Sequence, residues 1–121
     1  MTEPMTYAEL SEEYRMTMSR QYHQVRSDFY PAMRDLITAS EKALTEAIDT
    51  GASETTIDAL TSNFWNTKRL AESTVEARFM LLKRQVSQTA RPTKEFTDEE
   101  RLVIKRLANL EEAFTREVLG Q

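Results

Sequence analysis

Residues 53–88 read SETTIDALTSNFWNTKRLAESTVEARFMLLKRQVSQ and contain neither glycine nor proline. Apolar side chains recur in this segment at spacings that a helix brings to one face. The row consists of Ile57, Leu60, Phe64, Ala71, Val75, Phe79, Leu82 and Val86. We therefore predict one helix of about 35 residues, about 50 Å long. A compact four-helix bundle of this size does not need such a length, so we expect one end to project or bend and to be covered by another subunit.

Two further helices precede this segment. The first is predicted to begin at Thr6, because Glu9 three residues later completes a capping-box pattern. Its apolar row is Tyr7, Leu10, Tyr14, Met18, Tyr22 and Val25. A new cap at Ser27 or Asp28 begins the second helix, and Gly51 ends it. The apolar row of this second helix is Tyr30, Met33, Ile37, Leu44 and Ile48.

A fourth helix follows the linker-like segment 87–95, in which Pro92 prevents helix continuation. Thr97 and Glu100 form a second capping-box pattern, and Gly120 provides the stop. The apolar row of this helix is Val103, Leu107, Leu110, Phe114 and Val118.

The composition agrees with a few long helices. The chain has 121 residues with only two glycines and three prolines, whereas average usage gives roughly eight glycines at this length. Sandwiches, barrels and doubly wound sheets need many more glycine-containing turns. We predict a single all-α domain over residues 1–121, a four-helix, bundle-like fold with one long third helix.

Several classes of protein are excluded by what the sequence lacks. The chain contains no cysteine, which excludes a disulfide framework, thiol catalysis and thiolate metal sites. The N-terminal segment has neither the basic nor the apolar region of a signal peptide. No apolar run reaches the roughly 18 residues of a membrane span. We expect a cytoplasmic protein that makes no contact with a membrane.

Catalytic motifs are also missing. The single histidine, His23, lacks the Glu-x-x-His spacing of metal-carboxylate bundles, so we expect no metal. Glycines occur only at 51 and 120, which excludes glycine-rich phosphate loops and the Gly-x-Ser-x-Gly elbow. We therefore predict a protein that is not an enzyme and that uses no cofactor.

Charge is distributed unevenly along the chain. Residues 1–60 hold 5 Lys and Arg against 11 Asp and Glu, whereas residues 61–121 hold 11 against 9. The segment 61–94 carries two acids and seven basic residues: Lys68, Arg69, Arg78, Lys83, Arg84, Arg91 and Lys94. These side chains can form the solvated face of a long helix, meet an acidic partner, or bind nucleic-acid phosphates.

Two large aromatic residues, Phe64 and Trp65, are adjacent in the long helix. Adjacent helical positions point about 100° apart, so Phe64 is predicted to be core while Trp65 faces elsewhere. Two interpretations of Trp65 stay open: it lies under a neighbouring helix, or it is exposed as an interface anchor.

Two segments together resemble the helical A domain of GINS subunits, particularly the archaeal kind, and a third, closing segment also looks similar. The first is Asp28-Phe29-Tyr30-Pro31 followed by Ala32-Met33-Arg34-Asp35-Leu36-Ile37. The second is Asn63-Phe64-Trp65-Asn66-Thr67-Lys68-Arg69-Leu70, continuing to Glu76-Ala77-Arg78. The third is Phe96-Thr97-Asp98-Glu99-Glu100 ahead of a helix with Leu107 and Leu110. Their order and spacing are similar to the family's over most of residues 5–119.

The resemblance implies a non-catalytic replication factor. GINS subunits form a tetramer that links the MCM replicative helicase to a RecJ-like factor. On this basis we expect partners that are copies or paralogues of the chain, as a tetramer or dimer, together with MCM and a RecJ-like factor. The interface candidates are Trp65, Lys68, Arg69 and Arg78, whereas Tyr30 is expected to lock the second helix into the bundle. The β-rich B domain of the family is not expected within residues 1–121, so functions that depend on it are not carried over.

An alternative from another class is a small helical nucleic-acid-binding or nucleic-acid-mimicking protein, possibly phage-encoded. It would use the basic stretch, with Lys83, Arg84, Arg91 and Lys94 as a possible surface for DNA, or the acidic N-terminal half. Binding to phosphates weakens steeply as salt rises, whereas an apolar subunit interface barely responds, so salt separates the two hypotheses.

Overall fold

The computed structural model describes residues 3–19, 23–88 and 96–120. Within these ranges the chain forms helices and no strand. The helices are α1 (Tyr7–Thr17), α2 (Phe29–Asp49), α3 (Glu54–Gln88) and α4 (Asp98–Leu119). The all-α, bundle-like fold with a long third helix is therefore confirmed.

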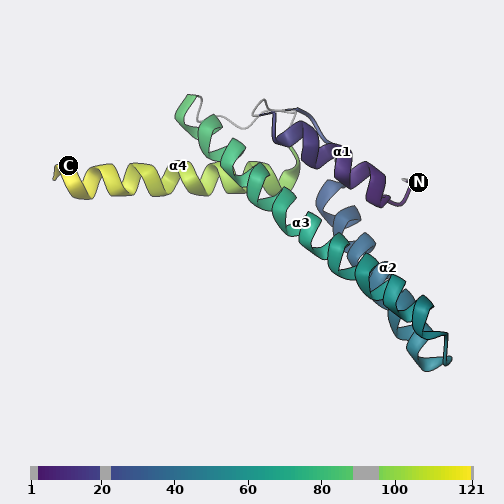
Figure 1. Ribbon diagram of the computed structural model, residues 1–121. Helices are drawn as coiled ribbons and strands as arrows, with labels where there is room; N and C mark the ends of the chain where they lie inside the picture. The colour runs from purple at the N-terminus through teal and green to yellow at the C-terminus, as the bar shows by residue number, and fades with distance from the viewer. Residues whose placement is uncertain (1–2, 20–22, 89–95, 121) are drawn as a thin grey trace.

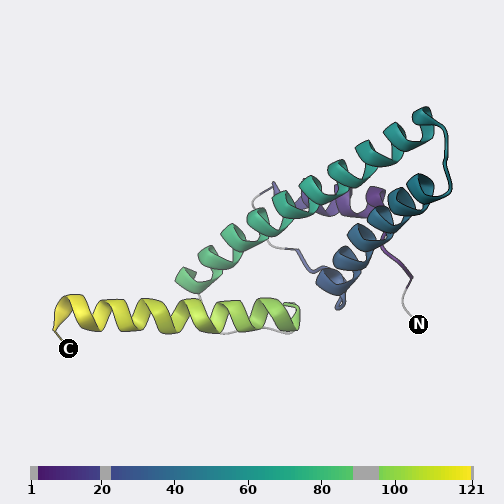
Figure 2. The same ribbon diagram turned by 90° about the horizontal axis from the view of Figure 1, so that it is seen from below.

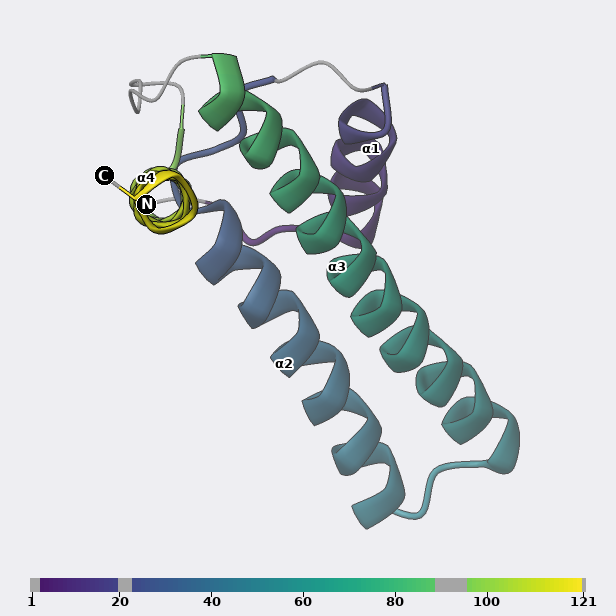
Figure 3. The ribbon, with the colours of Figure 1, turned by 90° about the vertical axis from the view of Figure 1, so that its left-hand side faces the viewer.

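The long helix α3 organises the molecule. It lies between α1 and α2, which pack on different sides of it (Figure 3). α2 runs antiparallel along the N-terminal half of α3, and α4 crosses the C-terminal half (Figure 1). The projecting element is α4, which extends beyond the end of α3 in both views (Figures 1 and 2). That one end of α3 is covered by another subunit stays a prediction.

Most helix ends agree with the caps read from the sequence. Thr6 accepts a hydrogen bond from the backbone N–H of Glu9 at the start of α1. At the start of α4, Thr97 and Glu100 form a complete capping box. Gly51 and Gly120 follow α2 and α4 with φ of 73° and 69°, a left-handed conformation that favours glycine.

The first helix is shorter than predicted. It ends at Thr17, where the Thr17 hydroxyl donates to the carbonyl of Glu13 and the Ser19 hydroxyl donates to that of Met16. Such bonds satisfy terminal carbonyls locally. Val25 was predicted to continue the helical row. It lies instead in the irregular segment that leads to α2, where its side chain is buried. Tyr22, in the same predicted row, lies outside the described residues.

Two separate apolar clusters form the core. The larger joins α1, α2 and the middle of α3, through Met5, Leu10, Val25, Phe29, Ala32, Met33 and Ala71. The smaller joins the C-terminal part of α3 to the beginning of α4, through Leu82, Phe96 and Ile104. The first half of α4 therefore packs on α3 through this smaller cluster, which is separate from the larger one.

Candidate assembly surface

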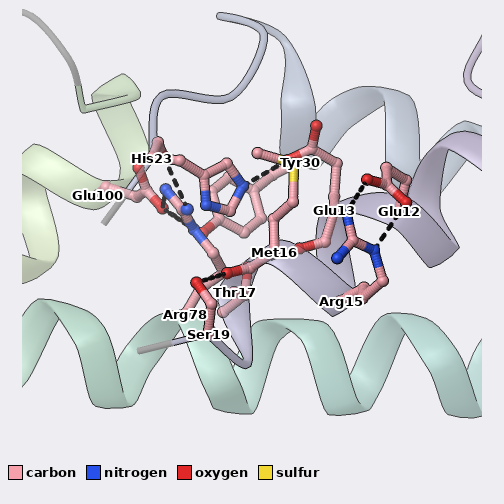
Figure 4. A network of polar contacts seen from close by, with 10 residues as sticks. All are labelled: Glu12, Glu13, Arg15, Met16, Thr17, Ser19, His23, Tyr30, Arg78 and Glu100. Atoms are coloured by element: carbon pink, nitrogen blue, oxygen red, sulfur yellow. Dashed lines mark hydrogen bonds and ion pairs between the residues drawn. The ribbon is translucent and has the colours of Figure 1, made fainter. Parts of the chain in front are cut away.

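A buried ion pair fixes the beginning of α4 on α3 (Figure 4). The Nη2 and Nε atoms of Arg78 lie 2.7 Å and 2.8 Å from Oε2 of Glu100. Both side chains are 1% exposed. A charge buried this deeply needs a partner and further hydrogen bonds, because taking it out of water is costly.

Further bonds extend this pair to the rest of the fold. The Tyr30 hydroxyl of α2 donates to Oε2 of Glu100 at 2.7 Å. Oε1 of Glu100 accepts the backbone N–H of Thr97 at 3.2 Å, and Nη1 of Arg78 donates to the carbonyl of His23 at 3.1 Å. We call Tyr30, Arg78, Thr97 and Glu100 the α4 junction. It connects three helices and the segment before α2, so it sets the direction in which α4 leaves the bundle.

The protonation states of the α4 junction are held by its own contacts. Burial alone would lower the pKa of the Arg78 guanidinium, but the Glu100 carboxylate outweighs burial and raises it. Burial raises the pKa of the Tyr30 hydroxyl far above its ordinary value, and the nearby Glu100 carboxylate raises it further. The Arg78 guanidinium therefore stays charged and the Tyr30 phenol stays neutral at neutral pH, which suits a fixed structural contact.

A second cluster of polar side chains holds the segment between α1 and α2 in place. Nε2 of His23 lies 2.6 Å from Oε2 of Glu13. Nε of Arg26 lies 2.6 Å from Oδ1 of Asp28, and its Nη1 lies 3.2 Å from Oε2 of Glu9. The Arg26 hydrogen bond lowers the pKa of the Asp28 carboxyl. These contacts hold the segment against α1 in place of the predicted continuation of the helix.

The second half of α4 has no cover within the described chain. Every residue from 109 to 119, which we call the α4 arm, is exposed. Three side chains of its apolar row, Leu110, Phe114 and Val118, are 67%, 64% and 62% exposed. The apolar row read from the sequence is therefore exposed along the arm, since α3 ends before the arm begins (Figure 2). A helix face of this kind on a folded protein marks an interaction surface.

An apolar hollow lies between α3 and the beginning of α4. It measures about 120 Å³ and is lined from α3 by Val75, Phe79 and Leu82, from α4 by Glu99, Glu100 and Val103, and from α2 by Tyr30. We call it the α3–α4 groove. Val75 and Phe79, which belong to the apolar row of the long helix, are exposed at its edge. The groove and the arm together form one apolar surface along α4.

The predicted interface residues fall into two groups. Trp65 is 50% exposed, and the Lys68 ammonium lies 5.3 Å from its ring centre. Arg69 lines a shallow hollow of about 250 Å³ between α1 and α3, together with Tyr7 and Tyr14. Phe64 is buried, as predicted, whereas Trp65 is half exposed and packs its ring edge-on against that of Phe64, with the ring centres 5.2 Å apart. Trp65, Lys68 and Arg69 are thus available to a partner.

Arg78 is not available, because it is enclosed in the α4 junction; its assignment as an interface candidate is corrected. Lys83 and Arg84 are exposed, and the Lys83 ammonium lies 5.8 Å from the ring centre of Phe79. Arg91 and Lys94 lie outside the described residues. Of the predicted basic surface, Lys83 and Arg84 are therefore exposed on α3.

The sequence did not reveal the tertiary role of Glu100. The capping box accounts for one of its oxygens and gives no hint that the other meets Arg78 and Tyr30. A signal was present, since Glu100 lies on the same helical face as Ile104 and Leu107. An acidic residue within the apolar row of a helix predicts a basic side chain buried beside it, because a buried carboxylate needs a charged partner.

Within the described ranges, no group of three or more His, Cys, Asp and Glu side chains is arranged to hold a metal ion. No helix in the part of the chain that the structure describes is long and apolar enough to cross a membrane. No protein-family model, curated protein sequence or solved structure matches the chain.

Proposed function

We propose that the protein is a non-catalytic scaffold subunit that assembles with copies of itself or with paralogous subunits. The observation that carries this proposal is the α4 arm, whose apolar row is left without cover on a helix that the junction holds in one direction. Fully burying a Leu, Phe or Val side chain stabilises a complex by about 1.5–3 kcal/mol. Burying three such residues on each of two copies favours association, and the gain is set against the cost of bringing two molecules together.

We further propose that the assembly acts in DNA replication, as the resemblance to GINS subunits implies. The support is that the three segments carrying the resemblance meet at one place. Tyr30 of the first, Arg78 of the second and Glu100 of the third contact one another in the α4 junction. In this role the subunit links MCM helicase to other factors of the replication fork, in the cytoplasm and close to the nucleoid. Trp65, Lys68 and Arg69 would then be available to contact such a factor.

Nucleic-acid binding is the second candidate function. The observation that favours it is the pairing of Lys68 with Trp65 and of Lys83 with Phe79, all exposed on α3. Bases stack on exposed aromatic rings while basic side chains meet the phosphates. Glu72 and Glu76 lie between the two pairs and oppose phosphate binding, so we place this function second.

The test is the mass of the purified protein by light scattering behind size exclusion, at low and high salt. A dimer or tetramer that persists at high salt is expected, because apolar contacts are not screened. The variant Leu110→Ser/Phe114→Ser should be monomeric, whereas Asn109→Ser/Glu112→Asp, which keeps the charge on the other side of the arm, should assemble normally.

A monomer at both salt concentrations would overturn self-assembly. Titration of the same sample with a labelled single-stranded oligonucleotide then tests the second function, since its affinity should fall steeply with salt. If the oligomer forms, the next binding experiment uses purified MCM, with Trp65→Ala as the variant expected to weaken binding.

A further inference from the structure

Resting on the proposed self-assembly, we propose that two copies of the chain pair antiparallel through α4, with the arm of each copy seated on the α3–α4 groove of the other. The occupant of the exposed face is therefore a second copy of this chain. Three features of α4 point to it: the continuity of its apolar row, the register that this row imposes, and the charge of its two halves.

The apolar row of the arm continues the row that packs on α3. Val103 and Leu107 are half-buried in the first half of the helix, and Leu110 and Phe114 follow in the arm at the same helical spacing. A second helix laid along this row would touch both halves. Because the first half already borders the groove, a helix that covers the row also covers the groove.

A two-fold axis between Ala108 and Asn109 brings the two rows into register. Leu107 of one copy then lies opposite Leu110 of the other, and Val103 lies opposite Phe114. The same register places Val118 opposite Glu99. Since Glu99 and Val103 both line the groove, Phe114 and Val118 arrive at its opening. Val75 and Phe79 there are the exposed apolar side chains that they would cover.

The charges of α4 favour the antiparallel arrangement. The arm carries three acids and one base, Glu111, Glu112, Glu117 and Arg116. The residues that face the arm in this register, 98–108, carry three acids and three bases, Asp98, Glu99, Glu100, Arg101, Lys105 and Arg106. Antiparallel overlap therefore sets the acidic arm beside a segment without net charge, whereas parallel pairing sets the two acidic arms together. The exposed Lys83 and Arg84 on α3 add positive charge to the side of the contact that the arm would meet.

The experiment uses the absence of cysteine, which allows single spin labels without background. Asn109→Cys and Arg116→Cys lie seven residues apart on the side of α4 away from the row. In the antiparallel dimer the two labels at 109 are separated by about 1.5 Å along the helix axis, and those at 116 by about 22 Å. Pulsed dipolar spectroscopy should therefore give a clearly longer distance at 116 than at 109.

Matched variants on α3 test the contact with the groove. Phe79→Ser should weaken dimerisation at least tenfold, although residue 79 is not part of α4. Trp65→Ser removes an equally exposed aromatic ring with its own lysine partner, about 21 Å further along α3, and should change dimerisation less than twofold. The labelled Asn109→Cys protein carrying Phe79→Ser should lose its dipolar signal at concentrations where the parent shows it.

The outcomes separate this proposal from the proposed function. A salt-resistant oligomer with equal distances at 109 and 116, or one unaffected by Phe79→Ser, overturns the antiparallel pairing and leaves the scaffold function standing. A monomer at every salt concentration overturns both.

Discussion

The two halves of α4 share one helical pattern of apolar residues, but the first half packs on α3 and the second half is exposed to solvent. In the first half, Glu100 and Ile104 are buried against α3, and the junction supplies an ion pair, a phenol and a capping box. In the second half, Leu110 and Phe114 continue the row in solvent. Both halves are helical and carry apolar residues at equivalent positions.

Helical periodicity therefore identifies the apolar face of a helix such as α4, but it does not identify the element that packs on this face. For the first half the cover is α3 of the same chain. For the arm, the described chain supplies none. The first half should therefore determine the stability of the monomer, and the arm should determine assembly. The predictions below separate these two contributions.

The largest effect is expected at the ion pair. Arg78→Ala leaves Glu100 as a buried carboxylate without its base, and losing one partner of a buried pair costs about 3–5 kcal/mol. Urea unfolding of the monomer at neutral pH, followed by circular dichroism, measures this cost. Arg116→Ala removes an exposed pair with Glu112 in the arm and should change the stability by less than about 0.5 kcal/mol.

A double replacement provides the control for Arg78→Ala. Arg78→Met/Glu100→Leu removes both charges and should recover most of the lost stability, because buried pairs can often be replaced by apolar residues. Equal losses for Arg78→Ala and Arg116→Ala would contradict the distinction between the two halves of α4.

The second prediction compares two apolar residues of the same helix. Ile104→Ala should lower the free energy of unfolding by about 2–5 kcal/mol, since Ile104 is fully buried in the smaller core. Leu110→Ala should change the unfolding of the monomer by less than about 0.5 kcal/mol. Light scattering should show the reverse order for loss of the oligomer. A monomer that loses as much stability from Leu110→Ala would mean that the arm packs on its own chain.

Much of the fold could be predicted from local signals. The run without glycine or proline gave the bounds of α3 to within a residue, and Thr97, Gly51 and Gly120 marked helix ends where the structure has them. These signals depend on backbone hydrogen bonds close in sequence. The end of α1 at Thr17 was missed because the apolar row runs on to Val25 and no glycine or proline marks the end.

The candidate site was less predictable because its contacts join distant segments. Arg78 seemed to belong to a basic surface, and only its contacts with Glu100 and the carbonyl of His23 make it internal. The groove could not be foreseen, since Val75 and Phe79 fit the core row of α3 as well as Leu82 does. Their exposure depends on the angle at which α4 crosses, and the junction sets that angle.

The third prediction concerns the pH dependence of the first half. The pKa of Tyr30 is raised in the folded state, mainly by burial. The unfolded chain therefore releases this proton near pH 10 while the folded chain keeps it, and stability falls by about 1.4 kcal/mol per pH unit above that value. Tyr30→Phe should remove this alkaline loss. Urea unfolding between pH 9 and about 11 measures both slopes, and parallel curves would contradict the buried contact with Glu100.

The smallest effects are expected from single substitutions at the two ends of α4. Thr97→Ala removes the side chain that accepts the N–H of Glu100, and the loss of such a cap costs about 1 kcal/mol. This loss should appear in the global unfolding of the monomer, because the cap and the ion pair share Glu100.

Gly120→Ala strains a left-handed residue by a similar amount, yet it should only fray the arm, since residues 109–119 make no buried contact in the described chain. Hydrogen exchange resolves the two cases: protection should fall throughout α4 for Thr97→Ala and only beyond residue 109 for Gly120→Ala. In the dimer the fraying should disappear, because the second copy covers the arm that the monomer leaves in solvent.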